Sequence, residues 1–314
     1  MAATSPQPAE GGTAETWATL FIDLLGWSTK LLEYDQVHRY RDDGARVSKT
    51  ITDPIQDHEL ARVAIEGVLE GKKAANDTEE HQSHVAALKG DDRDLFEAIT
   101  AYPFVLRLFG DSFVLNFPCG SDPRFGDAVA AGRLHALLHQ AGFMMVVLLA
   151  TGVPLRGGAE IGVGTEYTPR GKPGKELVSA SIAKAYRLEH EIANYPRIVV
   201  GRDLVGYLSW IAGKPQGTTA ARLAAAAAKS ALSLCRTEAD GSVSLDFLSP
   251  NIIGAQGLTG RETADRAFAF VRSQFFEAQA RHDAKLVGRY GLAMHYFLER
   301  LGPPAPPKDA APSP

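Results

Sequence analysis

Two aspartates stand at positions suited to binding a cation. Asp111 lies in the stretch Leu106–Phe117 (L-R-L-F-G-D-S-F-V-L-N-F), where a Gly-Asp pair separates two short apolar runs. This pattern predicts a tight β-hairpin with Asp111 at its tip. Asp23 interrupts the apolar run Thr19–Trp27, which otherwise indicates a buried strand. Because an unpaired buried carboxylate is costly, two such acids on neighbouring strand ends predict a divalent-metal site.

Each aspartate also has a purely structural interpretation. Aspartate is also a common turn residue, whose side chain hydrogen-bonds to its own backbone, and this alternative applies to Asp111. Asp23 precedes an expected helix, where a negative charge stabilises the N-terminus. The pair of acids, each in a matching context, favours the metal site over these two alternatives.

The elements that must position these acids follow an α+β order. The expected strands are Trp17–Asp23, the hairpin Tyr102–Phe117, Phe143–Ala150, Leu155–Gly162 and Arg197–Val200. The expected helices are Leu25–Tyr40, Glu59–Gly71, Phe125–Ala141 and Leu177–Ile192, and Lys72–Asp94 reads as a polar insertion. Strands and helices in this order predict one mixed sheet with helices on its face.

The character of the chain changes after about residue 200. Expected helices cover Asp203–Ile211, the Ala-rich stretch Ala220–Leu234, Ala264–Arg281 and Asp283–Leu301, and Val243–Phe247 alternates like a strand. We therefore predict a disordered N-terminus over 1–14, a catalytic domain over 15–200, a mostly helical C-terminal elaboration over 201–301 and a disordered Pro/Ala-rich tail over 302–314.

Composition excludes several classes of partner. The 314 residues carry a net charge of −4, so no basic field favours nucleic acid or an anionic membrane. The most apolar run, Phe143–Ala150, has the length of a strand, and we expect no membrane span. Cys119 and Cys235 lie far apart without metal-type spacing, which is typical of free thiols in a reducing cytoplasm.

Four motifs, taken in order, resemble those of class III nucleotidyl cyclases. They are F-I-D-L-L-G-W-S, L-R-L-F-G-D-S-F, P-L-R-G-G-A-E-I-G-V-G and G-K-E-L-V-S-A-S-I-A-K-A-Y-R-L-E. The resemblance covers roughly residues 17–200, and the first two motifs are the more specific. Within the family the chain is most similar to the bacterial pyrimidine cyclases of the Pycsar anti-phage systems. The resemblance implies a ferredoxin-like core with a mixed or antiparallel sheet.

The resemblance assigns roles to individual residues. Asp23 and Asp111 fall on the two aspartates that bind two divalent metal ions, Mn²⁺ or Mg²⁺, and the backbone carbonyl of Leu24 adds a ligand. Arg187 falls on the transition-state arginine. The Asn that the family carries four residues earlier is Ala183 here, which puts in doubt how the ribose or the developing charge is handled.

The same resemblance places two residues at the base. Arg107 falls where adenylyl cyclases carry a Lys and guanylyl cyclases a Glu, and Glu176 falls on the second base-reading acid. A guanidinium suits the carbonyl oxygens of either pyrimidine, whereas Glu176 suits uracil N3–H or the cytosine amine. Arg107 on the exposed face of a strand and Glu176 as a first-turn helix acid are the alternatives.

The loop R-G-K-P-G-K carries Lys172 and Lys175 just before an expected helix N-terminus, where they suit a triphosphate. A solvated basic loop is an equal interpretation. Tyr186, on the following helix, reads as a packing residue. Gly157 and Gly158 read as places where the strand approaches another backbone closely.

These implications together describe a cytoplasmic enzyme that converts UTP into 3′,5′-cyclic UMP and diphosphate. CTP as substrate, a purine cyclase, and a degenerate module that binds nucleotide without chemistry remain alternatives, as does an interaction scaffold built on the C-terminal helices. The resemblance further implies a homodimer with shared active sites, in which Arg107, Glu176 and Arg187 come from the second protomer. It also implies a separate effector protein that senses the cyclic nucleotide in anti-phage defence.

Overall fold

The computed structural model describes residues 13–25, 55–70, 78–100, 104–120, 125–169, 174–256 and 258–303. Residues 26–40 of the expected helix Leu25–Tyr40 and the loop residue Lys172 lie outside these ranges, as do most of the two termini predicted to be disordered.

The described strands form one sheet of eight strands. The order is β2-β3-β1-β4-β6-β8-β7, and β5 pairs with β4 outside this path. The strands are β1 (Glu15–Leu24), β2 (Val105–Phe109), β3 (Ser112–Pro118), β4 (Leu155–Tyr167), β5 (Glu176–Ser179), β6 (Ile198–Val200), β7 (Cys235–Thr237) and β8 (Val243–Leu245).

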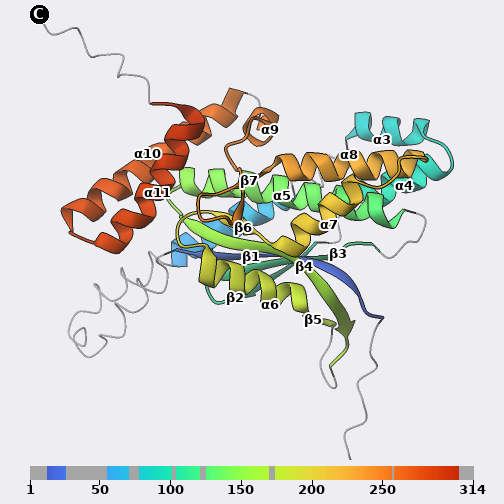
Figure 1. Ribbon diagram of the computed structural model, residues 1–314, viewed down its shortest axis with the longest axis horizontal. Coiled ribbons are helices and arrows are strands. Elements are labelled where there is room, and N and C mark those ends of the chain that lie inside the picture. The colour runs from blue at the N-terminus through green and yellow to red at the C-terminus, as the bar shows by residue number, and fades with distance from the viewer. Residues whose placement is uncertain are drawn as a thin grey trace, which may run out of the picture.

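The first four strands of the path define the core topology. β1 pairs antiparallel with both β3 and β4, and β2 pairs antiparallel with β3. Helical segments connect β1 to β2 and β3 to β4. This β-α-β-β-α-β order is the ferredoxin-like arrangement. β4 and β6 pair in parallel, so the whole sheet is mixed. The predicted α+β class, with a mixed sheet covered by helices, is confirmed (Figure 1).

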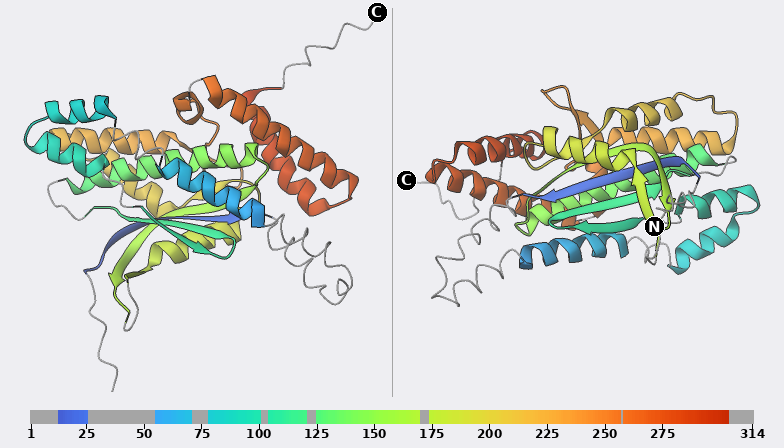
Figure 2. Two further views of the ribbon diagram at one scale, coloured as in Figure 1. Left: turned by 180° about the vertical axis from the view of Figure 1, so that it is seen from behind. Right: turned by 90° about the horizontal axis from the view of Figure 1, so that it is seen from below.

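Helices cover both faces of the sheet. They are a helix over residues 55–70, α3 (Glu79–Ala87), α4 (Asp91–Thr100), α5 (Gly126–Ala150), α6 (Ala180–Arg187), α7 (Arg202–Ala212), α8 (Thr219–Ser233), α9 (Pro250–Ile253), α10 (Leu258–Ala280) and α11 (Ala284–Leu301). Helices α5 and α8 lie on one face and α6 on the other, as the front and rear views both show (Figures 1 and 2). β1 is consequently buried on both faces, which explains its continuous apolar sequence.

Helix α5 corrects one prediction. The run Phe143–Ala150, expected to be a strand, is the C-terminal part of this 25-residue helix. A short apolar run cannot be assigned by periodicity when it is surrounded by protein, and most residues of α5 are buried. By length and composition α5 is the one helix in the described ranges that could cross a membrane, but 61% of its most apolar window is buried inside the protein. It has the burial of a central core helix.

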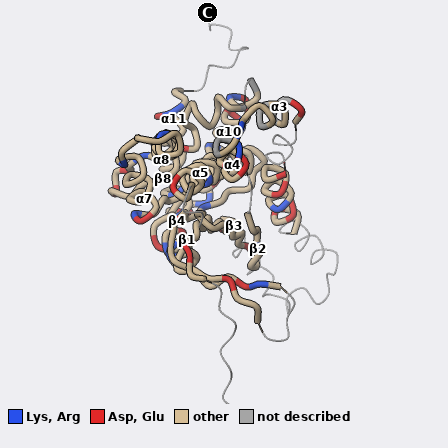
Figure 3. The backbone as a smooth tube through the Cα atoms, turned by 90° about the vertical axis from the view of Figure 1, so that its right-hand side faces the viewer, with Lys and Arg blue, Asp and Glu red and all other residues tan. Residues whose placement is uncertain are grey.

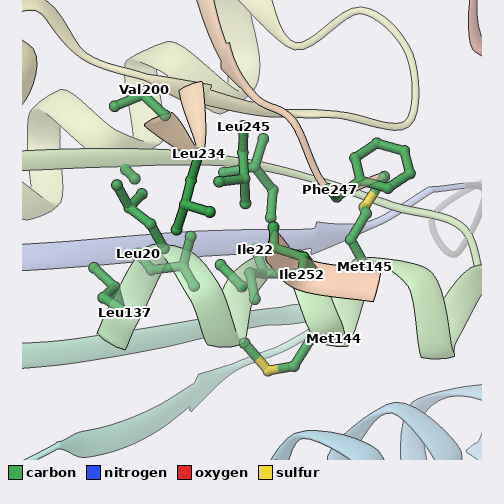
Figure 4. Close-up of a cluster of buried hydrophobic side chains, with 14 of the residues drawn as sticks. Leu20, Ile22, Leu137, Met144, Met145, Val200, Leu234, Leu245, Phe247 and Ile252 are labelled. Atoms are coloured by element: carbon green, nitrogen blue, oxygen red, sulfur yellow. The ribbon is translucent and has the colours of Figure 1, made fainter. Parts of the chain in front are cut away.

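Residues beyond 200 share the same sheet and core. β8 pairs with β6, and β7 with β8, so the sheet continues across the expected domain boundary. Figure 4 shows side chains of β1 and α5 packed against side chains from this later part of the chain. The labelled residues are Leu20, Ile22, Leu137, Met144, Met145, Val200, Leu234, Leu245, Phe247 and Ile252. Charged residues lie mainly along the outer helices, and β3 carries none (Figure 3).

The segment Leu177–Ile192, expected to be one helix, has three parts. It begins in β5, continues as α6, and ends in a π-helical turn, Leu188–Ile192. The side chain of Ser179 accepts a hydrogen bond from the backbone N–H of Ser181 and so caps α6. The sequence pattern missed β5 because four residues are too few to show a period.

Two glycines of β4 allow α6 to lie directly on the sheet. A Cβ added at Gly158 would stand 2.1 Å from the carbonyl oxygen of Ala185, and one added at Gly162 would stand 2.6 Å from the backbone nitrogen of Ser181. At Gly157 an added Cβ would stand 2.6 Å from the carbonyl oxygen of Phe21. The interpretation of Gly157 and Gly158 as sites of close backbone approach is confirmed.

Candidate functional site

The structure brings Asp23 and Asp111 to the same end of the sheet. Asp23 is the penultimate residue of β1 and pairs with Ser112, the first residue of β3. Asp111 lies at the turn between β2 and β3, where Gly110 has a φ of +61°, and its carbonyl oxygen accepts a hydrogen bond of 3.4 Å from the Leu24 backbone N–H. The hairpin predicted from the Gly-Asp pair is therefore present.

The pKa of Asp23 is shifted by burial and by two charged neighbours, Asp111 and Arg156. The pKa of Asp23 is raised, first because burial penalises the charged carboxylate and second because the negative charge of Asp111 is close. Arg156 opposes both effects. A cation in addition to Arg156 would bind favourably here, because the negative charges of Asp23 and Asp111 repel each other until they are neutralised.

Arg156, at the start of β4, is the immediate partner of Asp23. Its Nε and one terminal nitrogen each donate a hydrogen bond of 3.2 Å to Oδ2 of Asp23. Ser112 donates a longer bond of 3.5 Å to Oδ1 of the same carboxylate. Oδ2 is therefore tied to the guanidinium, whereas Oδ1 has only the weaker contact.

Glu189, in the π-helical turn after α6, completes the cluster. Its Oε1 lies 2.6 Å from Nε of Arg156, and its side chain is only 2% exposed. Burial, above all, raises the pKa of Glu189 to about 7, and Arg156 counteracts part of this rise. Arg289 of α11 adds positive charge nearby: its pKa is lowered by burial and by the charge of Arg156. Helix α11 thus borders the same end of the sheet.

Arg156 and Glu189 are two residues of the site that the sequence pattern does not reveal. Arg156 directly precedes Gly157 and Gly158, which have a structural interpretation, and Glu189 lies in a segment rich in charges. The sequence signal that could reveal Glu189 is its spacing from Ser181 and Ala185. The three residues are four positions apart, and all are buried. An acid on the helix face that must contact the sheet needs a partner, and Arg156 supplies it.

The donor set suits a hard divalent cation. Asp23, Asp111 and the Leu24 carbonyl offer oxygen atoms only, which Mg²⁺ and Mn²⁺ prefer. The side chain of Leu24 is buried in the core, so only its backbone is available to such a site. Among the described residues no group of three or more His, Cys, Asp or Glu side chains could hold a metal ion. Two carboxylates and a carbonyl need oxygens from a substrate to complete the coordination of a metal ion.

Arg107 shares a sheet face with Asp23. In the register, Arg107 pairs with Val114 and Val114 with Phe21, two residues before Asp23 on β1. Strand spacings place the Cα atoms of Arg107 and Asp23 roughly 12 Å apart. Arg107 is partly exposed, as a residue that contacts a ligand must be.

Tyr186 of α6 stands beside this face. Its ring contacts Phe21 edge-on, with centroids 5.4 Å apart, and stacks on His190 at 5.6 Å. The ring is 46% exposed. The prediction that Tyr186 packs is confirmed for one side of the ring, while the other side remains accessible.

Two predicted substrate residues lie far from the acids within one chain. Glu176 pairs with Tyr167 on the β4–β5 hairpin, and its Oε2 accepts a hydrogen bond of 2.9 Å from the Tyr167 hydroxyl. Arg156 and Tyr167 are eleven positions apart on β4 (167 − 156), or roughly 36 Å. Lys175 is exposed beside Glu176 and forms a 3.5 Å ion pair with Glu166. Glu176 starts a strand and is not the first-turn helix acid of the alternative interpretation.

Arg187 lies at the end of α6 that is nearer the acids, but its side chain points into solvent. It is 71% exposed and forms an ion pair of 3.3 Å with Glu191. Ala183, at the position of the family Asn, is exposed as well. Within a single chain, therefore, Arg187 does not contact the Asp23–Arg156–Glu189 cluster.

Comparisons with known proteins add little to this geometry. No protein-family model matches the chain, and no curated protein matches it in sequence. Among solved structures the chain is similar to the crystal structure of the guanylyl cyclase Cya2, with 11% identity and a TM-score of 0.32 over 64% of this chain and 80% of that one. The fold assignment therefore rests on the strand order and register described above.

Proposed function

We propose that this protein is a metal-dependent nucleotidyl cyclase that acts on a pyrimidine ribonucleoside triphosphate. The observation that carries the proposal is the meeting of Asp23 and Asp111 at one end of the sheet. The order of motifs that resembles class III cyclases supports it.

The reaction joins the ribose O3′ to the α-phosphorus and breaks the bond from that phosphorus to the diphosphate. Asp23, Asp111 and the Leu24 carbonyl would hold Mn²⁺ or Mg²⁺. A bound divalent ion lowers the pKa of a hydroxyl and neutralises phosphate charge. The proton of the 3′-hydroxyl passes to water as the new ester bond forms, and the products are the cyclic nucleotide, diphosphate and this proton.

The chain's own residues supply orientation. Arg107 offers a planar set of donors to the carbonyl oxygens of a pyrimidine base. Phe21 and Tyr186 form an apolar border beside Arg107 on the same face. We favour UTP, with CTP as the alternative; Arg107 suits either base, so the substrate assay below decides between them.

We further propose a homodimer. Glu176 and Lys175 lie roughly 36 Å along β4 from the acids, so one chain alone does not bring all the proposed residues together. The β4–β5 hairpin extends from the body of the molecule and carries Val163 and Val178, both more than 60% exposed (Figure 1). In a homodimer this hairpin would bring Glu176 to the acids of the second protomer.

The proposal extends to the role of the protein in the cell. The resemblance favours a cytoplasmic enzyme whose cyclic product activates a separate effector protein during phage infection. A second candidate is a nucleotide-binding module without turnover, and two observations favour it: Ala183 replaces the family Asn, and Arg156 already pairs with Asp23.

Turnover separates the two candidates. The purified protein is incubated with Mn²⁺ and each of the four ribonucleoside triphosphates, and cyclic products are identified by mass spectrometry. The proposal expects a cyclic pyrimidine nucleotide, with the product lost in Asp23→Asn and Asp111→Asn. Binding of a triphosphate without any cyclic product would instead identify a binding module.

A further inference from the structure

Glu189 is the most deeply buried acid near the proposed metal site. Its backbone lies against β4, since a Cβ added at Gly158 would stand 3.0 Å from the Glu189 nitrogen. It belongs to a π-helical turn, an irregularity that recurs at functional sites. The turn directs the Glu189 side chain toward Arg156, with only 2% of it exposed.

The contact between Glu189 and Arg156 is close but incomplete. Oε1 of Glu189 is 2.6 Å from Nε of Arg156, yet among the described residues it has no hydrogen-bond donor in suitable geometry. The reason is that Nε carries a single hydrogen, which is directed at Oδ2 of Asp23. A buried acceptor held by charge alone costs stability. Because this contact does not stabilise the fold, its role is to be sought in function.

The arrangement makes the Asp23 carboxylate asymmetric. Oε1 of Glu189 and Oδ2 of Asp23 both lie against Nε of Arg156, and the two carboxyl groups also interact directly with each other. Oδ1 accepts the longer hydrogen bond of 3.5 Å from Ser112 and no bond from Arg156, so it is the Asp23 oxygen better placed to bind a cation.

We propose that Glu189 is a positioning residue that acts on Asp23 through Arg156 and thereby sets the affinity of the site for a divalent cation. This inference rests on the proposed metal site. Glu189 anchors the guanidinium, and the anchored guanidinium orients the ligand carboxylate. Partners that orient a metal ligand typically change metal affinity by about 10- to 100-fold when they are altered.

The test measures Mn²⁺ binding without substrate, by the loss of the free Mn²⁺ signal in electron paramagnetic resonance. Glu189→Gln is expected to weaken binding about 10-fold or more. Glu191→Gln, the same change two residues away on an exposed side chain that pairs with Arg187, is the matched control and should leave affinity unchanged. Circular dichroism of each variant reports whether the fold is kept.

A double-mutant cycle separates positioning from a general effect of charge. In an Arg156→Gln background, Glu189→Gln should change Mn²⁺ affinity much less than it does in the wild type, because the residue through which Glu189 mainly acts is absent. Arg156→Lys provides a second background if Arg156→Gln fails to fold, and there the effect of Glu189→Gln should be reduced. An equal loss of affinity in all backgrounds would overturn the inference.

The failures are distinguishable. If the wild-type protein binds no Mn²⁺, or Asp23→Asn binds it as well as the wild type does, the proposed metal site is wrong. If the wild type binds Mn²⁺ and Asp23→Asn does not, but Glu189→Gln binds normally, the inference alone is wrong.

Discussion

Replacing Gly158 by Ala tests whether α6 lies directly on β4. The added Cβ would stand 2.1 Å from the Ala185 carbonyl oxygen and 2.8 Å from the Leu188 Cβ. Both distances are shorter than an ordinary van der Waals contact, and the nearest atom belongs to backbone. Since the helix cannot yield by rotating a side chain, α6 and the turn that carries Glu189 must move away from the sheet.

The expected cost follows from overpacking a tight interface. Added methyl groups in well-packed regions cost about 1–3 kcal/mol, and a backbone contact places Gly158→Ala at the upper end, about 3 kcal/mol. For a chain of this size, 1 kcal/mol shifts the melting temperature by roughly 2 °C, so we expect a decrease of about 6 °C. Urea unfolding followed by circular dichroism measures the same quantity as a free energy.

Gly206→Ala is the matched control. Gly206 lies inside α7, and an added Cβ there has no atom within 4 Å. Because Ala favours the helix, this change should stabilise the protein by up to about 1 kcal/mol. A Gly158→Ala protein as stable as the wild type, with unchanged Mn²⁺ affinity, would refute the close packing of α6 that positions Glu189.

Three further predictions concern other described residues. Glu160→Ala should destabilise the protein by about 1–3 kcal/mol in urea unfolding, because Glu160 accepts a 2.7 Å hydrogen bond from the Leu204 backbone N–H and caps α7; full stability would contradict this role. Arg107→Ala should raise the KM for the preferred pyrimidine triphosphate about 10-fold or more while Mn²⁺ affinity is unchanged; an unchanged KM would return Arg107 to the surface of its strand. Burial favours a higher pKa for Asp240, but hydrogen bonds from Ser242 and Arg197 outweigh it and lower the pKa to about 2, so the stability that Asp240 contributes is present above about pH 4 and lost as the pH falls toward 2. Urea midpoints of wild type and Asp240→Asn should therefore differ at pH 5 and converge at low pH, and a constant difference would count against this prediction.

The fold was predictable where local chemistry and tertiary structure agree. The Gly110-Asp111 turn signals its hairpin by residue type alone, and the apolar run ending at Asp23 signals a strand covered on both faces. The prediction of Phe143–Ala150 as a strand was wrong because this part of α5 is mostly buried, which removes the polar positions that reveal a helical period.

The site was predictable in part. Asp23 and Asp111 stand out because charges interrupt apolar strands, and the structure places them together. Glu189 could not be recognised in the same way, because its importance depends on a π-helical turn and on Gly158, 31 residues earlier (189 − 158), which lets the helix approach the sheet. The long separation of Glu176 from the acids follows from the length of β4, which sequence analysis ended five residues too early, at Gly162 in place of Tyr167.

The central claim is that Asp23 and Asp111 hold divalent metal for cyclisation of a pyrimidine triphosphate. The most direct measurement is the product formed from each of the four ribonucleoside triphosphates with Mn²⁺, by wild type, Asp23→Asn and Asp111→Asn. We expect cyclic UMP, or cyclic CMP, from the wild type and none from either variant. Product formation that is unaffected by both substitutions, or no cyclic product from any triphosphate, would contradict the claim.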